Sequence, residues 1–129
     1  MIFQLENKNI HASDSGQGID TNKDTIVFLH GSGLSHIVWS LAEQFFSSKN
    51  YNVLSIDLPG HGNSDGPCLE SIEKIADWLE QVFVNILESD QLKLSFLILI
   101  YQKLFLTNQQ FFQYFLNKDR LNCHVQVNL

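Results

Sequence analysis

Basic residues, cysteines and long apolar runs are all scarce in this 129-residue sequence, and each shortage excludes a class of protein. Eight Lys and Arg stand against 14 Asp and Glu, so the net charge of −6 offers no basic surface for nucleic acid. The two cysteines are too few for a disulfide scaffold and predict a reducing, cytoplasmic location. The most apolar stretch, Leu94–Tyr101, is far shorter than the about 20 residues of a membrane span, and the first residues lack a signal-peptide run.

Glycine, proline and alanine are missing from the last part of the chain. All seven glycines lie at or before Gly66, and residues 94–129 contain no Gly, Pro, Ala, Met, Trp or Glu. Net charge changes at the same place, because residues 1–93 carry 5 basic and 13 acidic groups whereas residues 94–129 carry 3 and 1. Since Gly and Pro make many of the turns of compact domains, we predict a boundary here. We expect residues 1–93 to form the N-terminal part of a domain and residues 94–129 to form a strand followed by an atypical tail, for which we hypothesise an out-of-frame origin.

The first 93 residues alternate between strand and helix patterns. Ile2–Glu6 and Ile10–Ser13 are short alternating runs joined by polar residues 7–9, which predicts a hairpin. Thr25–His30 is a β-branched apolar run typical of a strand buried on both faces, and Asn52–Asp57 is predicted to be a second buried strand. A third such strand is predicted over Leu94–Ile100.

Two helices are predicted between these strands. The first would begin after a capping Ser35 and bury Val38, Leu41, Ala42 and Phe45. The second would bury one apolar stripe made of Ile72, Ile75, Ala76, Leu79, Val82, Phe83 and Ile86. A hairpin followed by β-α-β-α-β predicts an α/β fold, with a mostly parallel sheet between two layers of helices. We expect this fold to be incomplete at its C-terminal side.

Two glycine-containing motifs follow the two central strands. His30-Gly31-Ser32-Gly33 lies at the carboxyl end of its strand, where open α/β sheets bind ligands. Glycines there would let backbone N–H groups face the crevice, although a plain turn explains this motif equally well. The second motif, residues 57–65, contains Pro59-Gly60, which is typical of a type II turn. Neither motif extends to a dinucleotide or P-loop fingerprint, and no spacing indicates a metal site, so no cofactor is expected.

Together, residues 27–34, Trp39 and residues 53–65 resemble the α/β-hydrolase superfamily, in particular its small esterase, lipase-like and carbon–carbon hydrolase members. The resemblance covers roughly residues 1–93. It implies that the Ser32 N–H, with the Gly33 N–H as the alternative, belongs to an oxyanion hole, where one donor contributes about 3–4 kcal/mol. It also implies that His30 and Gly31 hold this loop. The remaining loop residues, which have an architectural role in the family, are Pro59, Gly60, His61 and Gly62.

The sequence departs from the family at the nucleophile. In the family the fifth strand runs into Gly-x-Ser-x-Gly, whereas here it continues as Tyr101-Gln-Lys-Leu-Phe, with no later serine or glycine. No catalytic residue is therefore assigned, and we expect this chain to be inactive. Its full-length parent would be a serine hydrolase that cleaves carboxylic ester or related acyl bonds of a small molecule. A substitute triad of Ser95, Asp119 and His124 is disfavoured because Ser95 lies inside a strand.

A second hypothesis remains open beside the truncated hydrolase. A non-catalytic α/β binding module could use the loop crevice or the aromatic residues after 101 to bind a partner. The other conspicuous side chains have plainer interpretations. Trp39 and Trp78 are expected in the core, His11 and His61 on the surface or in turns, and Cys68 as an idle thiol at a helix start. The sequence does not predict the oligomeric state.

Overall fold

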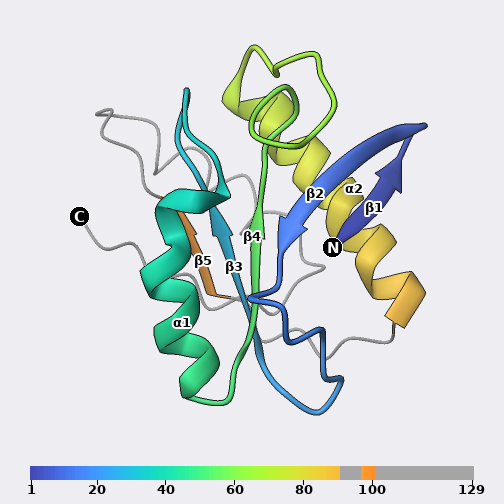
Figure 1. The fold of residues 1–129 in the computed structure, drawn as a ribbon. Helices are drawn as coiled ribbons and strands as arrows, with labels where there is room; N and C mark the ends of the chain where they lie inside the picture. Colours follow the sequence, from blue (N-terminus) through green and yellow to red (C-terminus); the bar gives the residue numbers. More distant parts are fainter. Residues whose placement is uncertain (91–96, 101–129) are drawn as a thin grey trace.

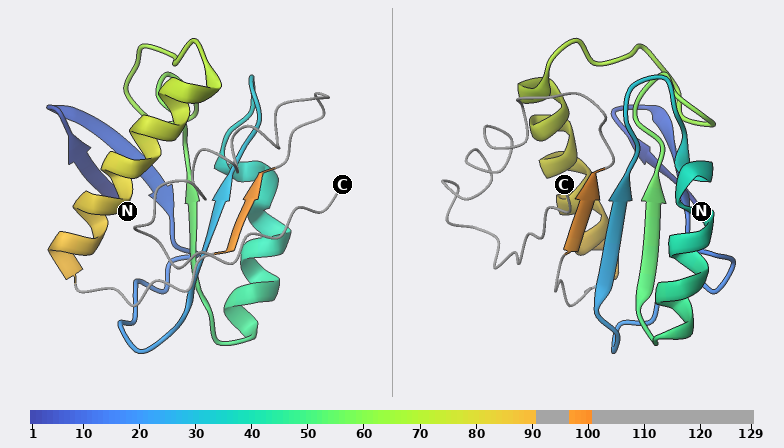
Figure 2. Two further views of the ribbon diagram at one scale, coloured as in Figure 1. Left: turned by 180° about the vertical axis from the view of Figure 1, so that it is seen from behind. Right: turned by 90° about the vertical axis from the view of Figure 1, so that its left-hand side faces the viewer.

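The computed structural model describes residues 1–90 and 97–100, which form one sheet with a helix on each face (Figure 1). The five strands lie in the order β1-β2-β4-β3-β5. Figure 2 shows helices α1 and α2 on opposite sides of this sheet, which confirms the predicted layers. The strands are β1 (Ile2–Leu5), β2 (Lys8–Ser13), β3 (Thr25–Leu29), β4 (Asn52–Ile56) and β5 (Leu97–Ile100). The helices are the short 3₁₀ helix η1 (His36–Trp39), α1 (Ser40–Ser48) and α2 (Ile72–Asp90).

The N-terminal hairpin is confirmed, but its turn is tighter than predicted. Leu5 pairs with Lys8, so only Glu6 and Asn7 form the loop. Their φ angles of 50° and 62° are those of a type I′ turn, whose twist matches the two strands that it joins. The loop predicted over residues 7–9 is therefore wrong, because Lys8 and Asn9 already belong to β2.

The parallel part of the sheet follows the sequence pattern closely. Every residue of β3 and of β4 is buried, as expected for strands covered on both faces. β3 pairs in parallel with β4 on one side and with β5 on the other. The third predicted strand is thus confirmed over Leu97–Ile100, whereas residues 94–96 and the tail lie outside the described residues.

Helix α2 buries the apolar stripe that its sequence predicts. Ala76, Leu79, Val82 and Phe83 pack with side chains of the sheet in the larger core cluster, and Trp78 joins them at 8% exposure. The side chain of Ile86 lies outside the described residues. The N–H of Lys74 donates to Ser71 Oγ (3.3 Å), so Ser71 caps this helix. Cys68 therefore precedes the helix as an exposed loop residue and does not begin it.

Helix α1 packs through Ala42, as predicted, but otherwise through a different face. Val38, Leu41 and Phe45 are 46%, 82% and 56% exposed, whereas Trp39, Ala42 and Phe46 pack on the smaller core cluster. Glu43, on the same side, is buried, and the Ser35 side chain makes no capping bond. Trp39, Ala42 and Phe46 are spaced i, i+3 and i+7, so they form a second apolar stripe one residue out of phase with the predicted one.

Trp39, directly before α1, belongs to the side that faces the sheet. Its ring stacks on Phe28 of β3 with a centroid distance of 4.9 Å, so its expected place in the core is confirmed. In the described part of the chain, every helix is too short or too polar to cross a membrane.

Candidate active-site loops and a buried aspartate–histidine cluster

The loop after β3 forms a type II turn over Gly31–Leu34. The N–H of Leu34 donates to the carbonyl oxygen of Gly31 (3.2 Å), and Gly33 has a φ of +75°, as the third position of such a turn requires. Ser32 and Gly33 are exposed, whereas Gly31 is buried. Within residues 1–90 and 97–100, neither the Ser32 N–H nor the Gly33 N–H has a hydrogen-bond acceptor. Two backbone donors are thus available at the carboxyl end of β3.

His30 connects this turn to the loop after β4. Its Nδ1 lies 2.8 Å from the Gly31 carbonyl oxygen, and its Nε2 lies 3.0 Å from the backbone nitrogen of Leu58. Nδ1–H therefore donates to the carbonyl oxygen while Nε2 accepts from the N–H, which requires the neutral imidazole. Burial lowers the pKa of His30 and favours the same neutral form. Both hydrogen bonds join main-chain atoms of the two glycine-containing loops.

The loop after β4 begins with the predicted type II turn. The N–H of His61 donates to the Leu58 carbonyl oxygen (2.9 Å), and Gly60 has a φ of +73°. A Cβ on Gly60 would lie 2.6 Å from Cys68 Sγ and 2.8 Å from the Cys68 backbone nitrogen. At this position glycine therefore serves both the turn and the close approach of the next segment. His61 Nδ1, near the Pro59 carbonyl oxygen (3.0 Å), also remains within the turn.

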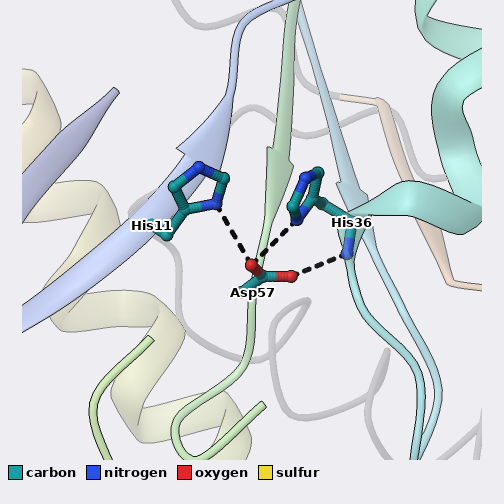
Figure 3. Close-up of side chains that lie close together, drawn as sticks. All are labelled: His11, His36 and Asp57. Carbon is teal, nitrogen blue, oxygen red and sulfur yellow. Dashed lines mark hydrogen bonds and ion pairs between the residues drawn. The ribbon is translucent and has the colours of Figure 1, made fainter. Parts of the chain in front are cut away.

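Asp57, at the end of β4, is fully buried and accepts bonds on both carboxylate oxygens. Oδ1 accepts the backbone N–H of His36 (2.6 Å), and Oδ2 accepts the backbone N–H of Asn63 (3.0 Å). The Nδ1 atoms of His36 and His11 also lie 2.8 and 3.1 Å from Oδ2 (Figure 3). Burial alone would raise the pKa of Asp57, but the Asn63 and His36 hydrogen bonds outweigh it, so the pKa is lowered. Asp57 is a buried anion.

Sequence reasoning missed this cluster because its members come from separate elements. His11 lies on β2, and the antiparallel pairing of Ala12 with Ile56 brings it beside Asp57. The interpretation of His11 as a surface residue is therefore wrong, since only 19% of its side chain is exposed. His36 lies where η1 begins and turns its ring toward Asp57. The three sequence positions share no motif spacing, so only the strand register reveals them.

The part of the chain that contains both glycine-containing loops is similar to known proteins. The model of the alpha/beta hydrolase family matches residues 26–96, which is more than half of the chain. The (E)-2-((N-methylformamido)methylene)succinate hydrolase of Acinetobacter baylyi is 32% identical over 73 residues, or 56% of this chain. The pimeloyl-[acyl-carrier protein] methyl ester esterase of Vibrio campbellii is 36% identical over 73 residues, or 57% of this chain. In both cases the match covers only 26% of the relative's length.

Solved structures support the fold. The Aspergillus niger epoxide hydrolase superposes with a TM-score of 0.67 at 18% identity, over 99% of this chain and 33% of its own. The thioesterase domain from the curacin biosynthetic pathway gives 0.61 at 17% identity, over 79% of this chain and 36% of its own. From the family match and the shared fold we conclude that this chain belongs to the alpha/beta hydrolase family.

Proposed function

We propose that this chain provides the charge-stabilising loop of an alpha/beta hydrolase whose full-length form cleaves carboxylic ester or related acyl bonds of a small molecule. The observation that carries the proposal is the exposed type II turn at Ser32 and Gly33, at the carboxyl end of a buried parallel strand. The two relatives, a hydrolase and a methyl ester esterase, belong to this class of reaction. The cysteine content favours a cytoplasmic location.

The proposed role of the turn follows from the chemistry of acyl transfer. Attack on an ester carbonyl places negative charge on its oxygen, and one N–H aimed at that oxygen stabilises the transition state by about 3–4 kcal/mol. The Ser32 N–H is our first choice of donor and the Gly33 N–H the second. His30 is a positioning residue, because its two hydrogen bonds fix the turn relative to Leu58. The loop of Pro59, Gly60, His61 and Gly62 supports that arrangement.

We further propose that the 129-residue chain does not turn over esters by itself. Its sequence lacks Gly-x-Ser-x-Gly and contains no serine after Ser95, so no acyl-enzyme can form at the family position. Residues 1–93 are then the N-terminal part of the catalytic domain, and residues 94–129 add the fifth strand and an atypical tail. Translating the other two reading frames after codon 93 tests this point. A Gly-x-Ser-x-Gly within about ten codons supports a shifted frame, and its absence supports the binding module.

A chimera tests the proposed loop function. Residues 1–93 would replace the matching segment of the Vibrio campbellii esterase, and hydrolysis of a methyl ester would be followed. Ser32→Pro removes the N–H but suits the second position of a type II turn, so kcat should fall about 100-fold with the turn preserved. Ser32→Ala keeps the N–H and should keep the activity. Equal activity of both variants would exclude the Ser32 N–H as the donor. The Gly33 N–H, which is still present in Ser32→Pro, would then be the remaining candidate.

The intact chain is the complementary test. With a chromogenic short-chain ester we expect no turnover above that of buffer. Turnover abolished by Ser95→Ala would contradict the missing nucleophile and support the substitute triad.

A further inference from the structure

The aspartate–histidine cluster is the most unusual polar feature of the described residues, and the proposed oxyanion loop does not use it. His11, His36 and Asp57 each place one possible ligand atom within 4.8 Å of the others. They come from β2, from η1 and from the end of β4, and both imidazoles point toward the same carboxylate oxygen, Oδ2 (Figure 3). The centroids of the two imidazole rings are 4.6 Å apart.

The carboxylate oxygen Oδ2 has more nitrogen neighbours than it can satisfy. His36 Nδ1, Asn63 N and His11 Nδ1 lie 2.8, 3.0 and 3.1 Å from it. Each oxygen of a carboxylate offers two lone pairs, so three donors cannot all make well-directed hydrogen bonds to Oδ2. A bound cation would reduce the number of hydrogen-bond donors that compete for Oδ2. It would take one lone pair of Oδ2 and the Nδ1 lone pairs of both neutral imidazoles, leaving the other lone pair to the Asn63 N–H.

From this geometry we infer that His11 Nδ1, His36 Nδ1 and Asp57 Oδ2 form a binding site for a zinc ion. Two imidazoles and one carboxylate are a ligand set that suits zinc, whereas calcium and magnesium prefer oxygen ligands alone. Tetrahedral zinc with bonds of about 2.0–2.1 Å separates its ligand atoms by about 3.3 Å, so the two Oδ2–Nδ1 distances need to open by only tenths of an ångström. The histidine side chains are 19% and 18% exposed, which gives a water molecule access to a fourth position.

The surroundings hold the three side chains in place before any ion arrives. The backbone N–H groups of His36 and Asn63 fix the plane of the Asp57 carboxylate. The N–H of His11 donates to Ser64 Oγ (2.9 Å), and the Ser64 hydroxyl donates to the Asp57 carbonyl oxygen (2.8 Å). Such outer hydrogen bonds orient the ligands of metal sites. Zinc bound here would join β2, η1 and β4 and stabilise the fold.

Titration of the metal-free, full-length chain with zinc chloride in a non-coordinating buffer tests the inference by calorimetry. We expect one zinc ion per chain and a rise in thermal unfolding temperature with zinc concentration. His11→Asn and His36→Asn keep an amide N–H near the place of Nδ1, so the bond to Asp57 survives while the imidazole ligand is lost. Each should weaken zinc binding by at least about tenfold. His61→Asn, which changes a described histidine outside the cluster, should not.

Circular dichroism of every variant separates loss of the site from loss of the fold. Cobalt(II) gives a second readout without any mutation, because a tetrahedral site produces strong visible absorption and scattered surface binding does not. The inference is overturned if the folded chain binds no zinc, or if both cluster variants bind it as the unmodified chain does. Loss of binding in His61→Asn alone would overturn it too, by placing the metal beside Cys68, whose Sγ lies 4.0 Å from His61 Nδ1.

Discussion

Gly62 offers a sharp test of how tightly the loop after β4 packs on Asp57. A Cβ added at Gly62 would collide with the three terminal atoms of the Asp57 carboxyl group, and the residue has a φ of +52°. Alanine in this left-handed conformation costs about 1–2 kcal/mol. Displacing a buried, fully bonded group to make room costs about 1–3 kcal/mol more. Gly62→Ala should therefore lower the free energy of unfolding by about 2–5 kcal/mol.

Gly16→Ala is the matched control for this substitution. Gly16 has a φ of +71°, but its Cβ would have no heavy atom within 4 Å. Only the conformational cost of about 1–2 kcal/mol remains. Urea unfolding followed by tryptophan fluorescence measures both variants, and the difference between them isolates the contact with Asp57. Equal losses would refute the reasoning, because they would show that the carboxylate moves aside at no cost.

Two further predictions concern pH and the face of α1. The pKa values of His30 and Asp57 are both lowered in the fold, so the unfolded chain binds more protons than the folded one. The free energy of unfolding should therefore fall as pH drops below about 6.5, where unfolded His30 gains a proton, and again below about 3.9, where unfolded Asp57 does. Urea unfolding from pH 8 to 3 measures this dependence, and His30→Gln should remove most of the loss of stability near pH 6.5. If that loss is unchanged in the variant, it does not come from His30. Leu41→Ala should change stability by less than about 0.5 kcal/mol, whereas Phe46→Ala should cost about 2–4 kcal/mol in the same assay. The reverse order would restore the helix face that the sequence predicts.

Much of the fold is predictable from sequence because its signals are local. Short, mainly apolar runs that end at a glycine-containing turn are typical of buried parallel strands, and on this signal Thr25–Leu29 and Asn52–Ile56 were placed correctly. Pro59-Gly60 determines a type II turn through the φ angles of those two residues alone. The apolar stripe of α2 repeats over enough turns for its buried face to be unambiguous.

The phase of α1 and the surroundings of Asp57 required the tertiary structure. Phe46 and not Phe45 meets the sheet, and both belong to apolar stripes with the same helical spacing, so the sequence pattern could not choose between them. His11 meets Asp57 only through the register of β2 on β4, a pairing between residues 46 positions apart. Which segments become strands, turns and helices depends on neighbouring residues, so those choices can be predicted from local sequence. Only the assembled sheet decided which side chains share a site, because that depends on how distant strands align.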